Sequence, residues 1–277
     1  MKGPESENVA HTPPASAWKG KPLHDKQSEA DHRDLPIDKV GVRQLRFPIQ
    51  IRDKDHEFQN TIATIGMYVD LPKEFKGTHM SRFLEVLNGF GSLFHVESIP
   101  EVLAAMQIKL KAHTAHLDME FPFFREKAAP VSKRKSLMDY TARFEANAIG
   151  KEIDFVLEVK VPVTTLCPCS KAISRYGAHN QRGEVCVQVR FDNTVWIEDL
   201  IEIVEDSASS PLYALLKRED EKAVTEKAYE NPVFVEDLVR NVALRLKAHP
   251  DVTWFKVEAE NFESIHNHNA YACIEQG

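Results

Sequence analysis

The stretch TTLCPCSKAISRYGAHNQRG, Thr164 to Gly183, combines residue types that can do chemistry. Cys167 and Cys169 are separated by a single proline, and His179 follows Cys167 by twelve positions (179 − 167 = 12). Thiolate and imidazole together suit a borderline metal such as zinc. A closed structural zinc site usually has two Cys-x-x-Cys pairs, or one such pair with two histidines. The single Cys-x-Cys therefore favours an open, catalytic metal site, which nearby glutamates can complete.

Two further histidines, His266 and His268, lie near the end of the chain. In an extended backbone the side chains at i and i+2 share a face, so these two rings can point at one spot. The same holds for the two cysteines of the first motif, and only one residue of each pair need do so. The asparagines around the histidines equally favour a plain polar turn. A lone cysteine is more often a small buried side chain than a ligand. Cys186 and Cys273, in alternating apolar segments, are predicted to be buried in this way.

Basic side chains surround the cysteine motif in a chain of net charge −7. Lys171, Arg175 and Arg182 bracket the motif, and such groups can hold phosphate, although the pattern alone equally fits a solvated loop. The segment KGTHMSRF, residues 76–83, has a similar character, because a helix that begins there directs backbone N–H groups and Arg82 at an anion. Neither segment has Walker spacing, so nothing indicates hydrolysis at a γ-phosphate.

Composition limits the class of protein. The chain has 277 residues, of which 43% are hydrophobic and 9% aromatic, enough for a folded core. Its acidic balance argues against a protein that wraps nucleic acid. No apolar run has the length of a membrane span, and the first thirty residues lack the apolar core of a secretory signal, so we expect a cytoplasmic protein without a membrane partner. Four cysteines in such a chain indicate metal binding or catalysis rather than disulfides.

The pattern of apolar residues predicts a repeated architecture. Residues 1–38 are rich in proline and charge and are predicted to be a mobile tail, followed by a single bimodular catalytic domain over residues 39–277. In its first half, residues with strand character flank two helical patterns, the second of which opens with the capping-box sequence Ser98-x-x-Glu101. The predicted strands are 40–53, 61–72, 115–124 and 137–147, and the predicted helices are 79–90 and 98–110.

The same order of elements returns in the second half. Strict alternation predicts a strand pair on either side of the cysteine motif, then two amphipathic helices, the second of which follows the start signal Asn231-Pro232. The predicted strands are 153–161, 185–191, 252–260 and 269–275, and the predicted helices are 196–204 and 238–246. We therefore expect an α+β protein of two ββααββ halves, about 39–150 and 151–277, with antiparallel sheets and helices on one face. Its open sheet edges favour closure into an oligomeric barrel, although a sandwich with two similar halves fits the same pattern.

Three motifs, in this order, closely resemble a known family: the cysteine stretch, EDEKAVTEKAYENPVFVED (residues 219–237) and ENFESIHNHNAYA (residues 260–272). The family is GTP cyclohydrolase of type IB, the second bacterial folate GTP cyclohydrolase, and KGTHMSRF also looks like a segment of it. The resemblance runs from about residue 40 to the end. It implies the tunnelling fold, in a toroidal homotetramer with active sites at subunit interfaces.

The resemblance also implies a reaction and a metal. GTP is hydrolysed to 7,8-dihydroneopterin triphosphate and formate, the first step of tetrahydrofolate biosynthesis. Carried over position by position, the metal ligands are Cys167, His179, Glu221 and His266, and a divalent ion held there lowers the pKa of a bound water. Zinc and manganese suit these ligands, and ferrous iron is also admitted. Glu236 falls on the glutamate that anchors the purine.

The remaining roles are also implied by the resemblance. His268 and His79 are the expected proton shuttles, because an imidazole can both accept and donate near neutral pH. The triphosphate is expected to contact basic side chains, one of them from a neighbouring chain: Lys171, Arg175, Arg182 and Arg82. On pattern alone, Glu221 lies in a charge run typical of a solvated helix and Glu236 at a helix start that favours acidic residues.

Two other functions remain open on the sequence. A nitrile reductase of the deazaguanine pathway, a related enzyme on the same fold, would use Cys167 as a covalent nucleophile with NADPH and need no metal. A nucleotide-binding or metal-storing oligomer would bind its ligand without turnover. Metal content and turnover of GTP distinguish the three.

Overall fold

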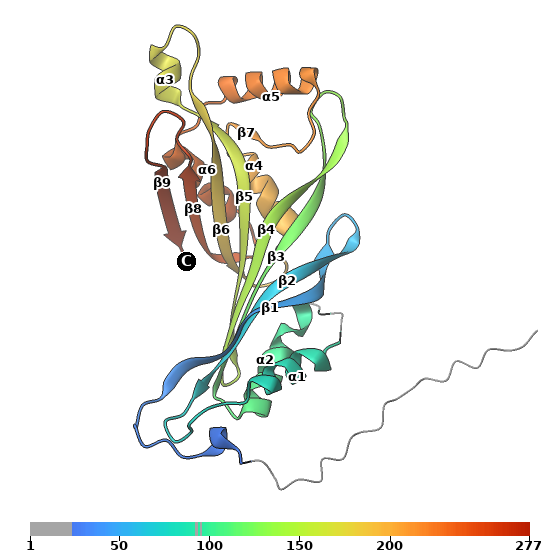
Figure 1. Cartoon of the computed structure of the whole chain (residues 1–277). Coiled ribbons are helices and arrows are strands. Elements are labelled where there is room, and N and C mark those ends of the chain that lie inside the picture. The colour runs from blue at the N-terminus through green and yellow to red at the C-terminus, as the bar shows by residue number, and fades with distance from the viewer. Residues whose placement is uncertain (1–23, 92–93, 95) are drawn as a thin grey trace, which may run out of the picture.

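The computed structural model describes residues 24–91, 94 and 96–277 (Figure 1). One long antiparallel sheet runs the length of the molecule, in the strand order β1-β2-β3-β4-β5-β6-β8-β9, and the short β7 pairs with the end of β5. The strands are β1 (Ile37–Asp53), β2 (Glu57–Leu71), β3 (Thr114–Ala128), β4 (Lys135–Ile149), β5 (Glu152–Leu166), β6 (Asn180–Phe191), β7 (Ser210–Pro211), β8 (Val252–Asn261) and β9 (Ala270–Gln276).

Helices occupy both ends of the sheet. In Figure 1, α1 and α2 lie at the lower end, while α3 and α5 lie at the upper end. The helices are α1 (Met80–Gly89), α2 (Ile99–Leu110), α3 (Pro168–Ile173), α4 (Ile197–Glu205), α5 (Arg218–Glu230) and α6 (Val235–Lys247), with short 3-10 turns at Lys26–Ser28 and Val96–Ser98. None of the helices within the described ranges is long and apolar enough to cross a bilayer.

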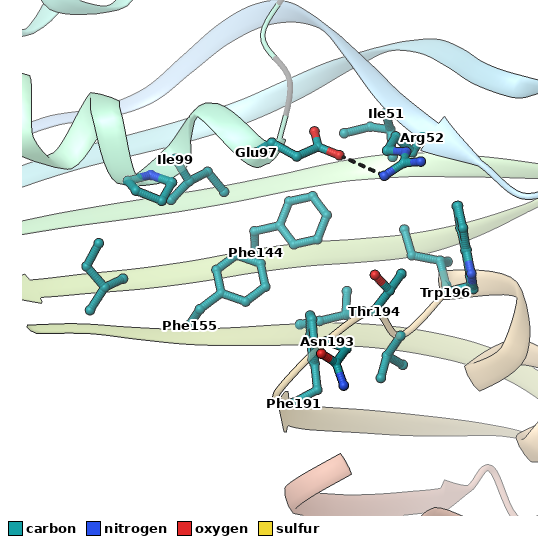
Figure 2. Close-up of a pocket in the computed structure, with 15 residues that line it drawn as sticks. Ile51, Arg52, Glu97, Ile99, Phe144, Phe155, Phe191, Asn193, Thr194 and Trp196 are labelled. Atoms are coloured by element: carbon teal, nitrogen blue, oxygen red, sulfur yellow. Dashed lines mark hydrogen bonds and ion pairs between the residues drawn. The ribbon is translucent and has the colours of Figure 1, made fainter. Parts of the chain in front are cut away.

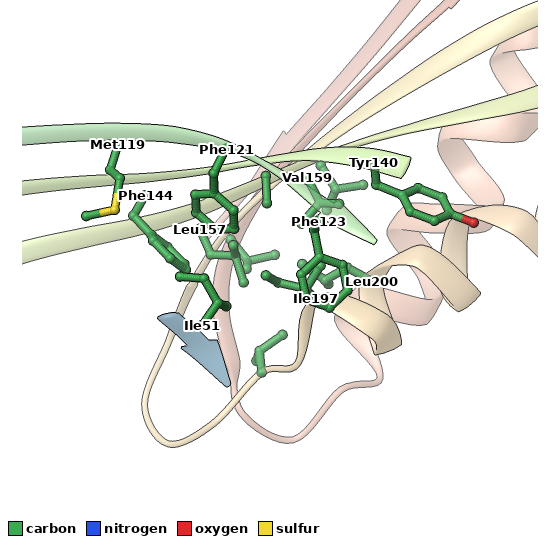
Figure 3. Packing of buried hydrophobic residues seen from close by; sticks show 14 of the residues in the cluster. Ile51, Met119, Phe121, Phe123, Tyr140, Phe144, Leu157, Val159, Ile197 and Leu200 are labelled. Atoms are coloured by element: carbon green, nitrogen blue, oxygen red, sulfur yellow. The ribbon is translucent and has the colours of Figure 1, made fainter. Parts of the chain in front are cut away.

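Strict alternation in the strands decides which face of the sheet the helices cover. From Met138 in β4 and from Leu157 in β5, every second residue is buried, and these side chains form one cluster with the apolar stripes of α1, α2, α4 and α6. Figure 3 shows Phe121, Phe144 and Leu157 between Ile51 of β1 and the side chains of α4. Each such burial contributes about 1.5–3 kcal/mol. The two halves of the chain therefore share a core.

The predicted fold class is confirmed, with additions in the second half. The first half follows the predicted ββααββ order. The second half adds α3 in the predicted loop, the bridge strand β7, and α5 along the charge run before α6. α5 was recognised as helical only from its charge pattern, because only Asp220 and Ala228 of its residues are buried.

Two helix starts differ from the prediction. The capping box at Ser98 is not formed. Ser98 ends the 3-10 turn, its backbone is already helical (φ −85°, ψ 0°), and its side chain makes no capping hydrogen bond. An N-cap residue needs an extended backbone for that bond. α6 begins at Val235, three residues after Pro232, because the N–H of Val233 donates to the carbonyl of Leu166 (3.1 Å) and keeps the chain out of the helix there.

The predicted tail is ordered over its last part. Residues 24–31 run beside residues 74–78, with hydrogen bonds from Lys76 N–H to Glu29 O and from Gly77 N–H to Gln27 O (3.1 and 3.2 Å). A β-bridge joins Ala30 to Phe75 in the same place. Part of the predicted tail, residues 24–31, is thus packed against the chain, and β1 begins at Ile37, whereas residues 1–23 lie outside the described residues.

Cys186 and Cys273 are not core residues. Val185 and Val187 point into the helix-covered core, so Cys186 between them lies half-buried on the opposite face of β6. Burial raises the pKa of its thiol to about 12. Cys273 on β9 is exposed. The alternation was interpreted correctly, but the prediction of burial was wrong, because both cysteines fall on the uncovered face.

Candidate active site

The cysteine motif forms the first turn of α3. Cys167 is the N-cap residue, with an extended backbone (φ −69°, ψ 116°), and Pro168 occupies the first helical position, where its missing N–H has no cost. The Cys167 sulfur accepts the N–H of Ser170 (3.4 Å). Cys169 is inside the helix and exposed, whereas Cys167 is half-buried. The two cysteines do not share a face of an extended chain, as the sequence allowed, and Cys167 is the one that faces the protein.

Cys167 and His179 meet at the base of the loop between β5 and β6. The N–H of Cys167 donates to the carbonyl of His179 (3.1 Å). Ser170 ties the two residues together, because its hydroxyl donates to the Cys167 carbonyl and accepts from the His179 N–H, each at 3.2 Å. The structure therefore brings together the two residues that the sequence places twelve positions apart.

The loop between β8 and β9 approaches His179 from the neighbouring strand. Phe262 N–H donates to the carbonyl of Arg182 (2.9 Å), and Glu263 places a carboxylate oxygen 3.9 Å from Nδ1 of His179. Farther along this loop, His266 and His268 are exposed, with stacked rings 5.1 Å apart. The two histidines do lie on one side of the chain.

Glu236 lies in the first turn of α6, close to the cysteine loop in the fold. The bond between Val233 N–H and Leu166 O fastens the entry to α6 beside the residue that precedes Cys167. The Glu236 side chain is exposed at the helix N-terminus, where backbone N–H groups favour an anion. A carboxylate that protrudes here is free to accept hydrogen bonds from a ligand.

Glu221 lies in the first turn of α5, at a distance from Cys167. Lys171 of α3 binds the other end of α5, where its ammonium donates to the carbonyl of Tyr229 and lies 4.4 Å from the centre of that ring. Eight residues separate Glu221 from Tyr229, which is about 12 Å along a helix. The first turn is fixed by Asp220, which is fully buried and accepts hydrogen bonds from Val131 and Ser132 of the β3–β4 turn and from Lys217.

The four expected metal ligands are only partly assembled. No three Cys, His, Asp or Glu side chains of residues 24–91, 94 and 96–277 are gathered closely enough to hold a metal ion. The chemistry of the four expected ligands fits zinc or manganese, because a thiolate, two imidazoles and a carboxylate make a mixed donor set. Cys167 and His179 are joined through their backbones, while Glu221 and His266 lie on separate elements.

The expected phosphate contacts are divided between two ends of the molecule. Arg175 and Arg182 are exposed near the cysteine loop, and their side chains make no hydrogen bond to other described residues. Arg82 and His79 belong to the start of α1, at the end of the sheet opposite α3 (Figure 1). There Nε2 of His79 lies 3.1 Å from a carboxylate oxygen of Asp25.

A cavity of about 430 Å³ lies elsewhere, between the two halves on the helix side of the sheet (Figure 2). Phe144, Phe155 and Trp196 line it, and an ion pair between Arg52 and Glu97 (3.4 Å) closes one side. None of the residues expected to hold the metal, transfer protons or bind GTP lines it. The chemistry-bearing groups therefore lie at the exposed end of β5 and β6 and not in this cavity.

Several residues at the site were not anticipated from the sequence. Ser170, Gln181, Glu263 and Asp220 make the contacts that hold the expected residues in place. Ser170 is the third residue after Cys167, the spacing of an N-cap contact, and could have been found on that ground. Glu263 and Asp220 act on residues distant in sequence, and Gln181 contacts the nearby His179 while its amide is held by Thr165 on the neighbouring strand, so no local pattern marks these three.

The fold places the protein in a structural class. The urate oxidase of Bacillus sp. TB-90 superposes with a TM-score of 0.51 over 87% of this chain and 99% of that chain, at 9% sequence identity. Identity this low shows the fold alone. Together with the continuous antiparallel sheet and the helices on one face, the likeness makes this a tunnelling-fold protein.

Sequence comparison then identifies the family. The family described as type I GTP cyclohydrolase folE2 matches residues 23–272. The GTP cyclohydrolase FolE2 of Akkermansia muciniphila is 61% identical over 257 residues (92% of this chain and 97% of that protein), and that of Citrifermentans bemidjiense is 59% identical over 254 residues (92% and 95%). This chain belongs to the FolE2 family of GTP cyclohydrolases. The predicted family and enzyme class are confirmed, and the match begins well before residue 40.

Proposed function

We propose that this enzyme hydrolyses GTP to 7,8-dihydroneopterin triphosphate and formate, the first step of tetrahydrofolate biosynthesis. The observation that carries the proposal is the pairing of Cys167 with His179 beside Glu236 in a chain of the FolE2 family. A carboxylate at position 236 can accept from both N1–H and the 2-amino group of guanine, a pair of donors that adenine does not offer. This contact accounts for a preference for GTP.

We infer that a divalent ion, zinc or manganese with ferrous iron as a further candidate, is held by Cys167 and His179. Glu221 and His266 complete the ligand set once α5 and the β8–β9 loop close on the site. Such an ion supplies Lewis acidity that lowers the pKa of water for attack at C8 of the purine. His268 and His79 move protons during ring opening and reclosure, since imidazole both donates and accepts near pH 7.

The triphosphate requires a cationic surface, and we propose that two chains provide it. Lys171, Arg175 and Arg182 lie on or beside the cysteine loop, while Arg82 and His79 lie at the opposite end of the same chain. A homotetramer with sites at subunit interfaces brings one end of a chain to the other end of its neighbour. The edge strands β1 and β9 of a single sheet are open to such pairing.

The compartment and partners follow from the substrate. We propose a cytoplasmic enzyme that acts on free GTP, with no nucleic-acid or membrane partner. Four unpaired thiols agree with a reducing compartment, and the net charge of −7 disfavours a nucleic-acid surface.

The test is turnover of GTP by metal-stripped protein with and without added Zn²⁺ or Mn²⁺, followed by oxidation and detection of fluorescent neopterin. Metal-dependent formation of pterin is the expected result. Absence of pterin with every ion, from folded protein that binds GTP, would contradict the proposal. NADPH oxidation with a nitrile-bearing deazaguanine is the matched assay for the reductase alternative.

A further inference from the structure

A buried polar chain ends at the ring of His179. Thr165 of β5 and Gln181 of β6 are cross-strand neighbours, and their side chains are 0% and 8% exposed. The Gln181 amide nitrogen donates to the Thr165 hydroxyl oxygen (3.0 Å), and the amide oxygen lies 3.0 Å from Nδ1 of His179. Apolar core residues occupy the equivalent positions farther along both strands, as at Val163 and Val185.

The orientation of the amide determines which ring nitrogen carries the proton. With its NH₂ group bonded to Thr165, Gln181 presents an acceptor oxygen to His179, so Nδ1 of the ring must be the donor. The carboxylate of Glu263, 3.9 Å from the same nitrogen, acts in the same sense, because a negative charge favours an N–H over a lone pair. At 3.9 Å it does not replace the shorter bond to Gln181. The proton on Nδ1 leaves Nε2 as the unprotonated nitrogen.

We propose that Gln181, held by Thr165, is a positioning residue that fixes His179 in the Nδ1–H tautomer and presents the lone pair of Nε2 to the site. Burial makes the arrangement specific, because a buried amide that loses a hydrogen-bond partner has no water to replace it. The orientation of the ring stands on these contacts alone. The use of Nε2 as a metal ligand rests on the function proposed above.

Two variants of Gln181 separate positioning from simple packing. Gln181→Leu keeps a side chain of similar volume but removes the acceptor for Nδ1–H, whereas Gln181→Glu retains an acceptor oxygen for the ring and can accept a hydrogen bond from the Thr165 hydroxyl. Gln188→Leu is the matched control, because this glutamine lies on the same strand and donates to Glu158 (2.6 Å) away from the site. Thr165→Val removes the support of the amide without touching His179.

Zn²⁺ affinity, measured by competition with a chelator on each folded variant, is the first readout. Gln181→Leu is expected to weaken Zn²⁺ binding by about 10- to 100-fold, as for other partners of a ligating histidine. Gln181→Glu should stay within about threefold of wild type and Gln188→Leu should be unchanged. Equal affinity of Gln181→Leu and wild type, or equal loss in both Gln181 variants, would overturn the proposal. If Gln181→Leu does not fold, the comparison of Gln181→Glu with Thr165→Val decides in the same way, with the loss expected only in Thr165→Val.

The ring tautomer provides a readout that is independent of metal. In metal-free protein labelled with ¹⁵N-histidine, the resonances lost in His179→Gln identify this ring, and their shifts should show a proton on Nδ1. A proton on Nε2 would overturn the positioning proposal even if the protein makes pterin. Protonation on Nδ1 in a protein that binds no Zn²⁺ and makes no pterin would instead contradict the proposed function and leave the positioning intact.

Discussion

Gly183→Ala tests whether the site depends on close packing between β6 and β8. A Cβ atom at Gly183 would lie 2.7 Å from Oδ1 of Asn261 and 3.2 Å from the carbonyl of Glu260. Asn261 is 3% exposed, and its Oδ1 accepts no hydrogen bond from the described residues. The methyl group therefore requires Asn261 to move at the point where β8 leads into the loop of His266 and His268.

The magnitude follows from two opposing contributions. Forcing an extra methyl group into a packed interior costs about 1–3 kcal/mol. Replacing glycine by alanine in a strand returns about 0.5–1 kcal/mol, because the unfolded chain loses freedom. With central values of about 2 and about 0.75 kcal/mol, Gly183→Ala should therefore lower the free energy of unfolding by about 1 kcal/mol. Pterin formation should fall further than this loss of stability explains, because the displaced loop carries His266.

A double-mutant cycle identifies Asn261 as the source of the loss. In Asn261→Ala, Gly183→Ala should cost less than about 0.5 kcal/mol, since the nearest obstructing atom is gone. Unfolding in urea measures all four proteins, and the fluorescence assay measures turnover. An undiminished cost of Gly183→Ala in the Asn261→Ala background would refute the argument, as would a Gly183→Ala protein with wild-type stability and activity.

Four further predictions have defined outcomes. Cys167→Ala should abolish pterin formation and Cys169→Ala should leave at least partial activity; the reverse pattern would transfer the ligand role to Cys169. Glu236→Gln should weaken productive GTP binding by about 1–3 kcal/mol, as for a mismatched donor pair, and normal kcat/KM would remove Glu236 from the site. Iodoacetamide at pH 8 should label exposed Cys169 well before Cys186, whose thiol pKa burial raises to about 12; equal rates, read by mass spectrometry, would contradict that burial. Burial alone would raise the pKa of Asp220, but the hydrogen bonds that its carboxylate accepts from Ser132, Lys217 and Val131 hold this pKa below its usual value. The ionised carboxylate therefore stabilises the folded protein above about pH 4, and this stabilisation is lost as the pH falls further. Asp220→Asn should therefore be less stable than wild type at pH 7, with the difference shrinking in acid, and a constant difference in urea titrations would contradict the assignment.

Local patterns in the sequence predicted the elements of the fold because burial alternates along each strand. The alternation around Phe144 and Val159 marks strands whose inner residues meet helices. The same pattern does not say which face is covered by a partner element, so Cys186 was assigned to the core although it lies on the opposite face. Whether a segment forms a strand can thus be predicted from its own residues, whereas the face of the strand that helices cover depends on the tertiary structure.

The candidate site shows the same division. The motif itself indicated Cys167 and His179, and the backbone bond between them places the two together. The position of Glu221 depends on how Asp220 fastens α5 to the β3–β4 turn, nearly ninety residues earlier in the chain (220 − 132 = 88). The bond between Gln181 and Thr165 likewise needs the register of β5 on β6. Contacts between distant segments have no signature in a single sequence.

The most direct test of the proposed reaction follows the carbon that the enzyme removes. GTP labelled with ¹³C at C8 is incubated with metal-loaded protein and observed by NMR. The account predicts one labelled formate for each 7,8-dihydroneopterin triphosphate formed, and no label in the pterin. Label retained on the nucleotide, or consumption of GTP that releases phosphate without formate, would contradict a GTP cyclohydrolase reaction at this site.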